Sequence, residues 1–262
     1  MIEVSHVTKR FYSLPVLHAV SFHVKKGETY VVLGQSGVGK TVLLKILAGL
    51  LNPDSGHVRI STRSIGMLFQ KNALFDSLTV QDNLDFPLRE HTDLKAVDRR
   101  IKTANFLEWV GLSGCESLFP HELSGGMQKR LGIARALIIE PEVILYDEPI
   151  AGLDPITSRM IIDLITRLKA QFGTTIIGVT SDVLRAFQMA DQVGLLVRAP
   201  LGATLIHAGT PAEARANPNA AIQQFLTGAT KGPLTSALDD TAITSTDPSF
   251  SQLYAELEND PF

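Results

Sequence analysis

Apolar and polar residues alternate near the start of the chain with the period of a β-strand. Val20, Phe22 and Val24 are separated by polar residues, as expected of a sheet that has one face in water. We therefore predict short strands within residues 1–30 and again at about residues 56–62.

Short continuous apolar runs follow, separated by segments of helical periodicity. Runs of this kind are typical of strands that are buried on both faces. We predict them at residues 30–34, 65–69, 143–147, 174–180 and 192–197. Because they alternate with helices, the predicted fold class is α/β, with a mostly parallel core sheet and a small antiparallel β subdomain.

Residues from about 72 to 140 interrupt this alternation with helical patterns. We interpret Trp109 as core of this segment, not as a binding platform. Other apolar residues recur there at approximate helical spacing. They are Leu94, Val97, Ile101, Leu107 and Val110. A further helix is predicted at residues 156–172, where Asp154 is a typical start and Gly173 a typical end.

The pattern weakens past residue 211. One short helix is predicted from Pro211, and its apolar residues are Ile222, Phe225 and Leu226. Residues 228–251 have the composition of a flexible linker. The amphipathic end segment that follows either folds back on its own domain or binds a partner, and both interpretations stay open. Its apolar residues are Phe250, Leu253, Tyr254 and Leu257.

Composition narrows the class of protein. The chain has 262 residues, of which 45% are hydrophobic and 19% charged, as expected of one large α/β domain with or without appendages. A net charge of −3 gives no electrostatic reason to expect nucleic-acid binding, which needs a basic face. Cys115 is the single cysteine, so no intrachain disulfide can form. No apolar run approaches the roughly 18 residues of a spanning helix, so we expect a soluble chain that needs another polypeptide to reach across a membrane.

The first candidate site follows the predicted strand at residues 30–34. The sequence there reads GQSGVGKT and fits the phosphate-binding pattern G-x-x-x-x-G-K-[ST]. Its glycines let backbone N–H groups surround an anion, and the following helix adds its positive end. Lys40 would reach the β- and γ-phosphates, and the Thr41 hydroxyl would ligate Mg²⁺. The cofactor-binding residues predicted here are Gly34, Gln35, Ser36, Gly37, Val38, Gly39, Lys40 and Thr41.

Two further stretches carry candidate chemistry. Ser124, Gly125 and Gly126 open another helical pattern, and a serine with two glycines at a helix start can bind an anion, although an ordinary helix cap is the alternative. Asp147 and Glu148 end the apolar run at residues 143–147, where ligands sit in open α/β sheets. We predict that Asp147 holds Mg²⁺ and that Glu148 polarises the attacking water.

The order of these stretches resembles that of the ATP-binding-cassette (ABC) family over residues 1–210, with residues 211–262 as a C-terminal extension. The resemblance implies a P-loop ATPase with an inserted helical subdomain that carries the LSGG stretch. It also implies that Ser124, Gly125 and Gly126 contact the γ-phosphate held by a second copy of the chain.

Further positions are implied by the same resemblance. Phe11 looks like the aromatic residue that stacks on adenine, with Tyr12 as a competing choice. Gln70 looks like the glutamine that senses Mg²⁺, which makes Thr41, Gln70 and Asp147 the implied metal set. Asp154 looks like the residue of the loop that bridges the two nucleotide sites.

The chain departs from the family pattern at two positions. Met127 stands where the signature usually has Gln, although Gln128 follows directly. Ser181 stands where the family usually has the His that contacts the γ-phosphate and helps to place the water. Glu148 and Ser181 are therefore the predicted catalytic residues. Because a serine hydroxyl has a shorter reach than an imidazole, we expect slow hydrolysis.

The stretch after Gln70 resembles the ATPases of Mla/Mce-type lipid transporters. It carries the pattern ALF…LTV…N…FPLRE, from residue 73 to residue 90. The resemblance implies an integral-membrane permease that docks near Leu74, Phe75 and Leu78, for which ordinary core packing is the alternative. It also implies an Mce-domain partner, in some systems a STAS-domain partner, and a location on the cytoplasmic face of the inner membrane.

Two other functions stay open from the sequence. The chain could be a soluble ABC protein that acts as a nucleotide-gated scaffold, although the ribosome type usually carries two cassettes and one set of motifs is present here. Ser181 leaves room for a degenerate ATPase that binds ATP and dimerises with little turnover.

Overall fold

The computed structural model describes residues 1–69 and 73–235. The chain divides into two units, Met1–Asn217 and Pro218–Phe262. Gln70 and the amphipathic end segment lie outside the described residues.

The first unit contains a small antiparallel sheet. Its strands are β1 (Ile2–Phe11), β2 (Leu14–Val24) and β4 (Ser55–Ile60), in the order β2-β1-β4. The inward residues of β2 include Leu17, Val20, Phe22 and Val24, which are buried. The alternating pattern of the sequence therefore predicted both the strands and the face that they bury.

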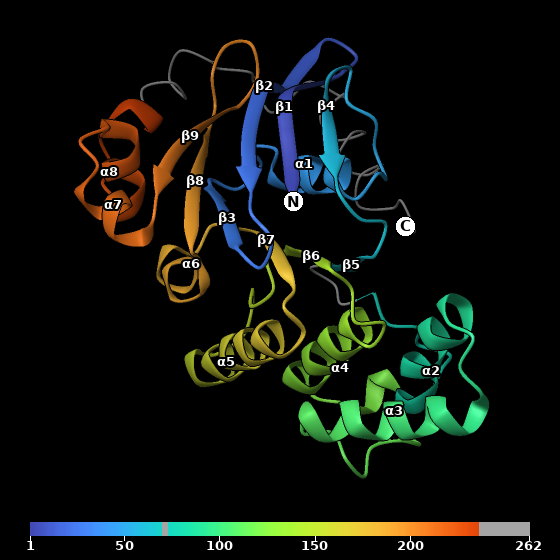
Figure 1. Cartoon of the computed structure of the whole chain (residues 1–262). Helices are drawn as coiled ribbons and strands as arrows, with labels where there is room; N and C mark the ends of the chain where they lie inside the picture. The colour runs from blue at the N-terminus through green and yellow to red at the C-terminus, as the bar shows by residue number, and fades with distance from the viewer. Residues whose placement is uncertain (70–72, 236–262) are drawn as a thin grey trace. The chain divides into compact units, whose positions relative to one another are not determined.

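A second sheet of six strands forms the centre of this unit and confirms the predicted α/β class (Figure 1). Its order is β5-β6-β7-β3-β8-β9, and every neighbouring pair is parallel except β8 with β9. The strands are β3 (Thr29–Gly34), β5 (Ile65–Leu68), β6 (Val143–Asp147), β7 (Thr175–Thr180), β8 (Gln192–Val197) and β9 (Thr204–Gly209). The carboxyl ends of β6, β7 and β3 consequently lie side by side.

The first unit also contains helices, several of which carry or adjoin the candidate motifs. They are α1 (Lys40–Leu47), α2 (Val80–His91), α3 (Ala96–Trp109), the 3₁₀ turn η1 (Pro120–Glu122), α4 (Gly125–Leu137), α5 (Pro155–Phe172), α6 (Val183–Met189) and α7 (Pro211–Ala216). As predicted, α5 begins after Asp154 and ends at Gly173, which adopts the left-handed conformation with φ 64°.

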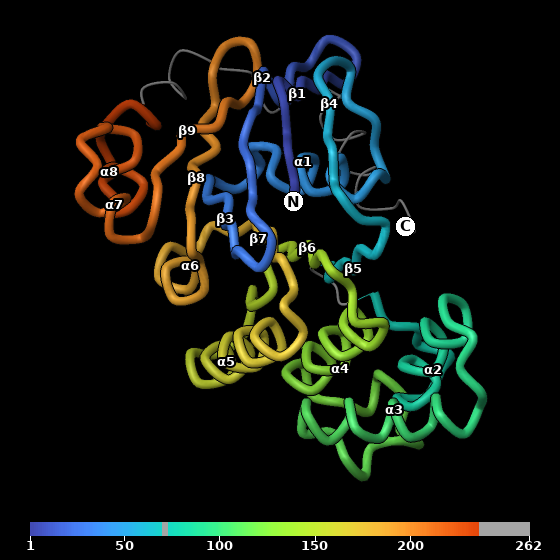
Figure 2. Tube along the Cα trace, in the orientation of Figure 1, coloured from blue at the N-terminus to red at the C-terminus, as the bar shows by residue number. Residues whose placement is uncertain are grey.

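Two apolar cores lie on opposite faces of the central sheet. Successive residues of β6 alternate between them, because side chains of a strand point to opposite faces in turn. Val143 and Leu145 pack with α1, whereas Ile144 and Tyr146 pack with α4 and α5. We call these the α1-side core and the α4-side core. Figures 1 and 2 show α1 on one side of β5 and β6, with α4 and α5 on the other.

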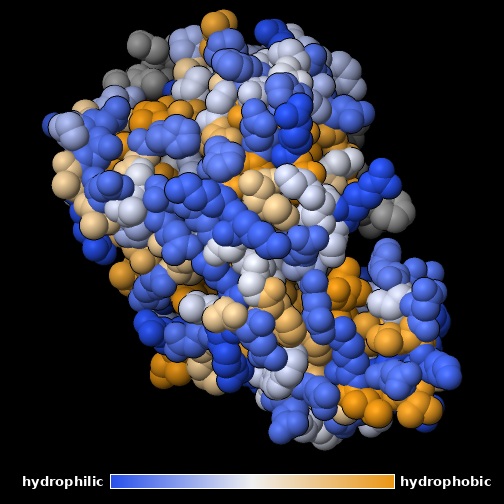
Figure 3. Space-filling model, in the orientation of Figure 1, coloured by the Kyte–Doolittle hydropathy of each residue, from blue (hydrophilic) through white to orange (hydrophobic). Residues whose placement is uncertain are grey.

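The helical segment differs from the expectation at two residues. Val97 and Ile101 share the helical spacing of the predicted apolar residues, but they are 68% and 56% exposed. The packed face of α3 is formed instead by Thr103, Phe106 and Leu107. In Figure 3 apolar side chains gather at the surface where α2 and α3 lie.

Trp109 is packed as predicted. Its ring lies 4.9 Å from that of Phe106 and 5.8 Å from that of Phe172, between centroids. Leu107 and Val110 are buried in the α4-side core, and Cys115 packs against it as a small hydrophobic residue.

The helix predicted from Pro211 is two helices. The first, α7, ends at Ala216, and Asn217-Pro218-Asn219 separates it from α8 (Ala220–Thr227). Proline lacks an N–H and fixes its backbone, so it cannot continue the first helix. Within the second unit, the buried Gln224 side chain donates to Ala229 O and accepts from Leu234 N, which holds the residues after α8 against it.

Candidate functional site

The phosphate-binding loop connects β3 to α1. Gly37 and Gly39 have φ angles of 72° and 110°, which side chains with a Cβ rarely adopt. A Cβ at Gly34 would lie 2.9 Å from Leu196 O of the neighbouring strand. The loop therefore needs glycine at these positions, as the motif predicted.

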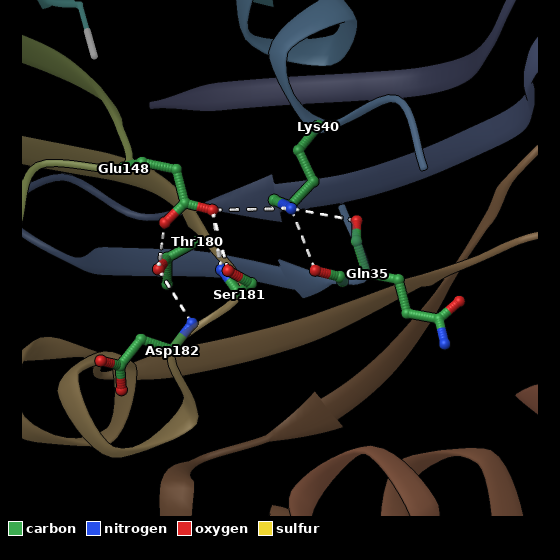
Figure 4. Close-up of polar contacts among 7 residues, drawn as sticks. Gln35, Lys40, Glu148, Thr180, Ser181 and Asp182 are labelled. Atoms are coloured by element: carbon green, nitrogen blue, oxygen red, sulfur yellow. Dashed lines mark hydrogen bonds and ion pairs between the residues drawn. The ribbon is translucent and has the colours of Figure 1, made fainter. Parts of the chain in front are cut away.

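Lys40 lies folded toward this loop. Its Nζ donates to Gly34 O at 3.0 Å and to Gln35 O at 3.1 Å, and it forms an ion pair with Glu148 Oε1 at 3.6 Å (Figure 4). Burial lowers the pKa of Lys40, and the negative charges of Glu148 and Asp147 oppose that shift. An ammonium held among carbonyl and carboxylate oxygens is placed to exchange these partners for phosphate oxygens.

Asp147 ends β6 and is buried beside the loop. Burial raises the pKa of its carboxyl, and a hydrogen bond with the Thr41 hydroxyl opposes that shift. The two predicted metal ligands within the described residues are thus in contact. Both present oxygen atoms, the ligand type that Mg²⁺ prefers.

Glu148 follows directly and has a φ of 46°, in the left-handed region. Its Oε2 accepts from Thr180 Oγ1 at 2.7 Å. Its Oε1 accepts from Ser181 N at 2.9 Å and from Ser181 Oγ at 3.3 Å. The predicted catalytic residues Glu148 and Ser181 therefore lie together at the ends of neighbouring strands (Figure 4).

The serine and glycines of the LSGG stretch open α4. Ser124 caps the helix, because its Oγ accepts from Met127 N at 3.4 Å. A Cβ at Gly125 would meet open space, whereas one at Gly126 would lie 3.0 Å from Thr157 Cγ2 of α5. The helix that follows the LSGG stretch, α4, packs in the α4-side core, whereas α1, which follows the phosphate loop, packs in the α1-side core. In one chain these two helices therefore lie on opposite faces of the central sheet.

Asp154 caps the next helix. Its Oδ1 accepts from Ile156 N at 2.9 Å and from Thr157 N at 3.0 Å. Hydrogen bonds with Thr157 lower the pKa of the Asp154 carboxyl. Because Thr157 also neighbours Gly126, the predicted bridging loop and the LSGG stretch are adjacent in one chain.

The two candidates for the adenine-stacking residue differ in exposure. Phe11 ends β1 and packs partly against the α1-side core, with Lys9 Nζ 5.4 Å from its ring centroid. Tyr12 is 88% exposed and has a φ of 51°. Both remain candidates.

The residues predicted to dock a permease form a loop before α2. Leu74 packs partly against the α4-side core. Phe75 is 37% exposed and lies between the Phe86 ring, 4.9 Å away, and the Arg135 guanidinium, 4.2 Å from its centroid. Arg135 also donates to Ala73 O. Leu78 is partly exposed.

Asn83 organises this loop and was not singled out as doing so from the sequence. Its side chain is fully buried, accepts from Phe75 N, and donates to the carbonyls of Phe75, Leu78 and Thr79 at 3.0–3.1 Å. Asn83 lies four residues after Thr79, which caps α2 in the structure.

The carboxyl ends of β6, β7 and β3 thus bring together Lys40, Thr41, Asp147, Glu148 and Ser181, as predicted. Gln70 lies outside the described residues, and its role stays a prediction. Thr180 was missed, because a threonine at the end of an apolar strand gives no signal that separates it from other strand residues. Within residues 1–69 and 73–235, no helix is long and apolar enough to cross a membrane.

Three comparisons identify the family. The ABC transporter family model matches residues 17–151. The probable ribonucleotide transport ATP-binding protein mkl of Mycobacterium leprae is 40% identical over 89% of this chain and 70% of its own length. The intermembrane phospholipid transport system ATP-binding protein MlaF of Escherichia coli is 36% identical over 82% of this chain and 84% of its own length.

A solved structure agrees with these sequence matches. The dimeric ATP-binding cassette MJ0796, bound to ADP and Pi in a post-hydrolysis state, has a TM-score of 0.67 and 29% identity, covering 74% of this chain and 94% of that one. With the phosphate loop, the paired carboxylates and the LSGG helix start in place, the chain belongs to the ABC transporter family as an ATP-binding and ATP-hydrolysing subunit.

Proposed function

We propose that this subunit powers the movement of lipid, with phospholipid the expected class, between membranes. The 36% identity to MlaF, which is named for intermembrane phospholipid transport, is the observation that carries this proposal. The stretch from Ala73 to Glu90 supports it, because its pattern resembles the lipid-transport ATPases. The mycobacterial relatives are named for ribonucleotide transport, which makes ribonucleotide the competing cargo.

The chemistry proposed for the site is hydrolysis of ATP by an oriented water. Lys40 and the N–H groups of the phosphate loop bind the β- and γ-phosphates. Glu148 accepts a hydrogen bond from the attacking water and so orients the lone pair of the water oxygen toward the γ-phosphate. Its contact with Lys40 supports this role, because the 3.6 Å ion pair puts the carboxylate beside the group that holds the phosphates.

Thr41 and Asp147 fit Mg²⁺, since their hydroxyl and buried carboxylate oxygens are already in contact. The ion would neutralise charge on the phosphates when bound. Gln70 remains a proposed third member of this set.

A second copy of the chain is the proposed partner that completes each site. Its Ser124, Gly125 and Gly126 would donate to the γ-phosphate, with Asp154 at the junction of the two copies. The proposal is supported by the open space at Gly125 and by the dimeric state of the related cassette MJ0796. Exposed N–H groups at a helix start suit a bound anion.

The membrane partners are proposed from the same resemblance. An integral-membrane permease would dock near Leu74, Phe75 and Leu78, which places the subunit at the cytoplasmic face of the inner membrane. An Mce-domain protein and a STAS-domain protein are further proposed partners. The half-exposed Phe75, held by Phe86 and Arg135, supports an apolar anchor at the surface.

Transfer of lipid between vesicles tests the function. The tagged chain is isolated with its membrane complex and reconstituted, and transfer of a fluorescent phospholipid to acceptor vesicles is followed with and without ATP. We expect ATP-dependent transfer that Lys40→Ala abolishes. Labelled ribonucleotide uptake is measured in the same vesicles. Uptake without lipid transfer would contradict the proposed cargo, and isolation without any membrane protein would favour the soluble scaffold.

A further inference from the structure

The carboxylate of Glu148 is held by hydroxyl and amide donors from the end of the neighbouring strand β7. We propose that Thr180 is a positioning residue, which holds the Glu148 carboxylate in the orientation that hydrolysis needs. This inference rests on the proposed role of Glu148 as the group that orients the water.

Thr180 is suited to this role by its own hydrogen bonds. Thr180 is buried, with 5% of the residue exposed. Its hydroxyl oxygen lies 2.7 Å from Glu148 Oε2. The same oxygen accepts from Asp182 N at 3.1 Å. Because a carboxylate only accepts and an amide N–H only donates, the single hydroxyl proton of Thr180 is committed to Glu148.

The geometry explains why Glu148 needs such a donor. Lys40 attracts Oε1, and Ser181 donates to the same oxygen. Among residues 1–69 and 73–235, Thr180 is the side chain that donates to Oε2. When Lys40 turns to the phosphates, the contacts from β7 remain to fix the carboxylate. A threonine side chain is stiff about χ1, so its hydroxyl is a more rigid support than a long side chain would be.

Ser181 contributes differently. Its backbone N–H lies 2.9 Å from Oε1, whereas its hydroxyl lies 3.3 Å from the same atom. The shorter bond persists whichever residue stands at this position. The side chain on which the orientation of Glu148 depends is therefore that of Thr180.

Substitution of the full-length chain tests this assignment. Thr180→Val keeps the shape of the side chain and removes the hydroxyl, and Thr180→Ser restores a hydroxyl. Since a misplaced catalytic group can cost on the order of 100-fold, we expect Thr180→Val to lower kcat about 10- to 100-fold with KM and ATP affinity within about twofold. Thr180→Ser should recover most of kcat.

Thr29→Val is the matched control. Thr29 is a buried threonine of β3 in the same sheet, and its Oγ1 has no hydrogen-bond partner among the described residues. The same chemical change there should leave both kcat and thermal unfolding unchanged. It separates the loss of a hydroxyl as such from the loss of this hydrogen bond.

The outcomes distinguish this inference from the proposed function. Wild-type kcat in Thr180→Val, with Glu148→Gln inactive, would overturn the positioning role and leave Glu148 in place. Equal losses in Thr180→Ser and Thr180→Val, or a parallel loss of ATP binding, would show a structural role and also overturn it. Wild-type turnover in Glu148→Gln would refute the proposed base, and the inference with it.

Discussion

Ser181 stands at the end of β7, where its neighbours determine what a substitution can do. Its backbone N–H already supports Glu148, so the hydroxyl is the part that differs from the histidine usual in the family. The serine side chain contacts the carboxylate and has little reach beyond it. Slow hydrolysis therefore remains the expectation from this residue.

We predict that Ser181→His raises kcat and changes KM little. The backbone bond to Glu148 is kept, and the imidazole adds a donor that reaches further toward the γ-phosphate and the water. Steady-state ATPase assays on wild type and variant measure this change. An unchanged or lower kcat would show that the other residues of the site are arranged for serine and gain nothing from an imidazole.

Individual residues also show what the sequence predicted and what it did not. Lys40 was predicted from the pattern G-x-x-x-x-G-K-[ST]. Asp147 and Glu148 were predicted because they end an apolar run of the form that a buried strand takes. Thr180 and Asn83 were missed, because their roles depend on hydrogen bonds to residues brought near by folding. A polar residue with such a partner has no distinctive neighbour pattern in the sequence.

Asn83 determines the stability of the loop before α2. Asn83→Leu would leave the Phe75 N–H and the Leu78 carbonyl without their side-chain partner, whereas the Phe75 carbonyl keeps its bond from Leu78 N. Buried groups left unpaired cost about 1–3 kcal/mol each, so we predict a loss of about 2–3 kcal/mol in the free energy of unfolding, measured in urea. Asn105→Leu on the exposed side of α3 is the control, and it should change this free energy by less than about 0.5 kcal/mol. A similar loss in both variants would contradict the assigned role.

The helix α3 shows why periodicity alone can choose the wrong face. Val97 and Ile101 have helical spacing, but the helix packs through Thr103, Phe106 and Leu107. At about 100° per residue, Val97 lies ~120° from Thr103 around the helix axis. Spacing identifies a stripe of residues, whereas only the neighbouring helices determine which stripe is covered.

The Phe75 surface of the same subdomain leads to a prediction about assembly. Phe75→Asp should abolish co-purification with the permease, because it removes an apolar anchor beside Arg135 while leaving the ATP site untouched. Val97→Asp changes another exposed apolar residue of the subdomain and should retain the complex. Loss of the complex in both variants would argue against a local docking site.

At the scale of the whole molecule, one chain carries its phosphate loop and its LSGG stretch on different layers. We predict that Glu148→Gln lowers hydrolysis at least ~100-fold and allows ATP-dependent dimers, because the phosphate contacts remain. Light scattering after gel filtration with and without ATP measures the dimer. A monomer that persists with ATP, under conditions where wild type pairs within its complex, would count against sites shared between two copies.

The order of strands in the central sheet has a consequence for synthesis on the ribosome. The strand β3 emerges early, yet Thr29 pairs with Ile176 and Tyr30 with Gln192. Translation must continue for about 150 residues, roughly 8–30 s at ordinary rates of synthesis, before this apolar strand gains its neighbours. Nascent chains stalled before β7 should therefore be cleaved by protease within β3 and bind chaperones, and those released after β8 should be protected. Early protection would mean that β3 first pairs with a temporary, non-native neighbour.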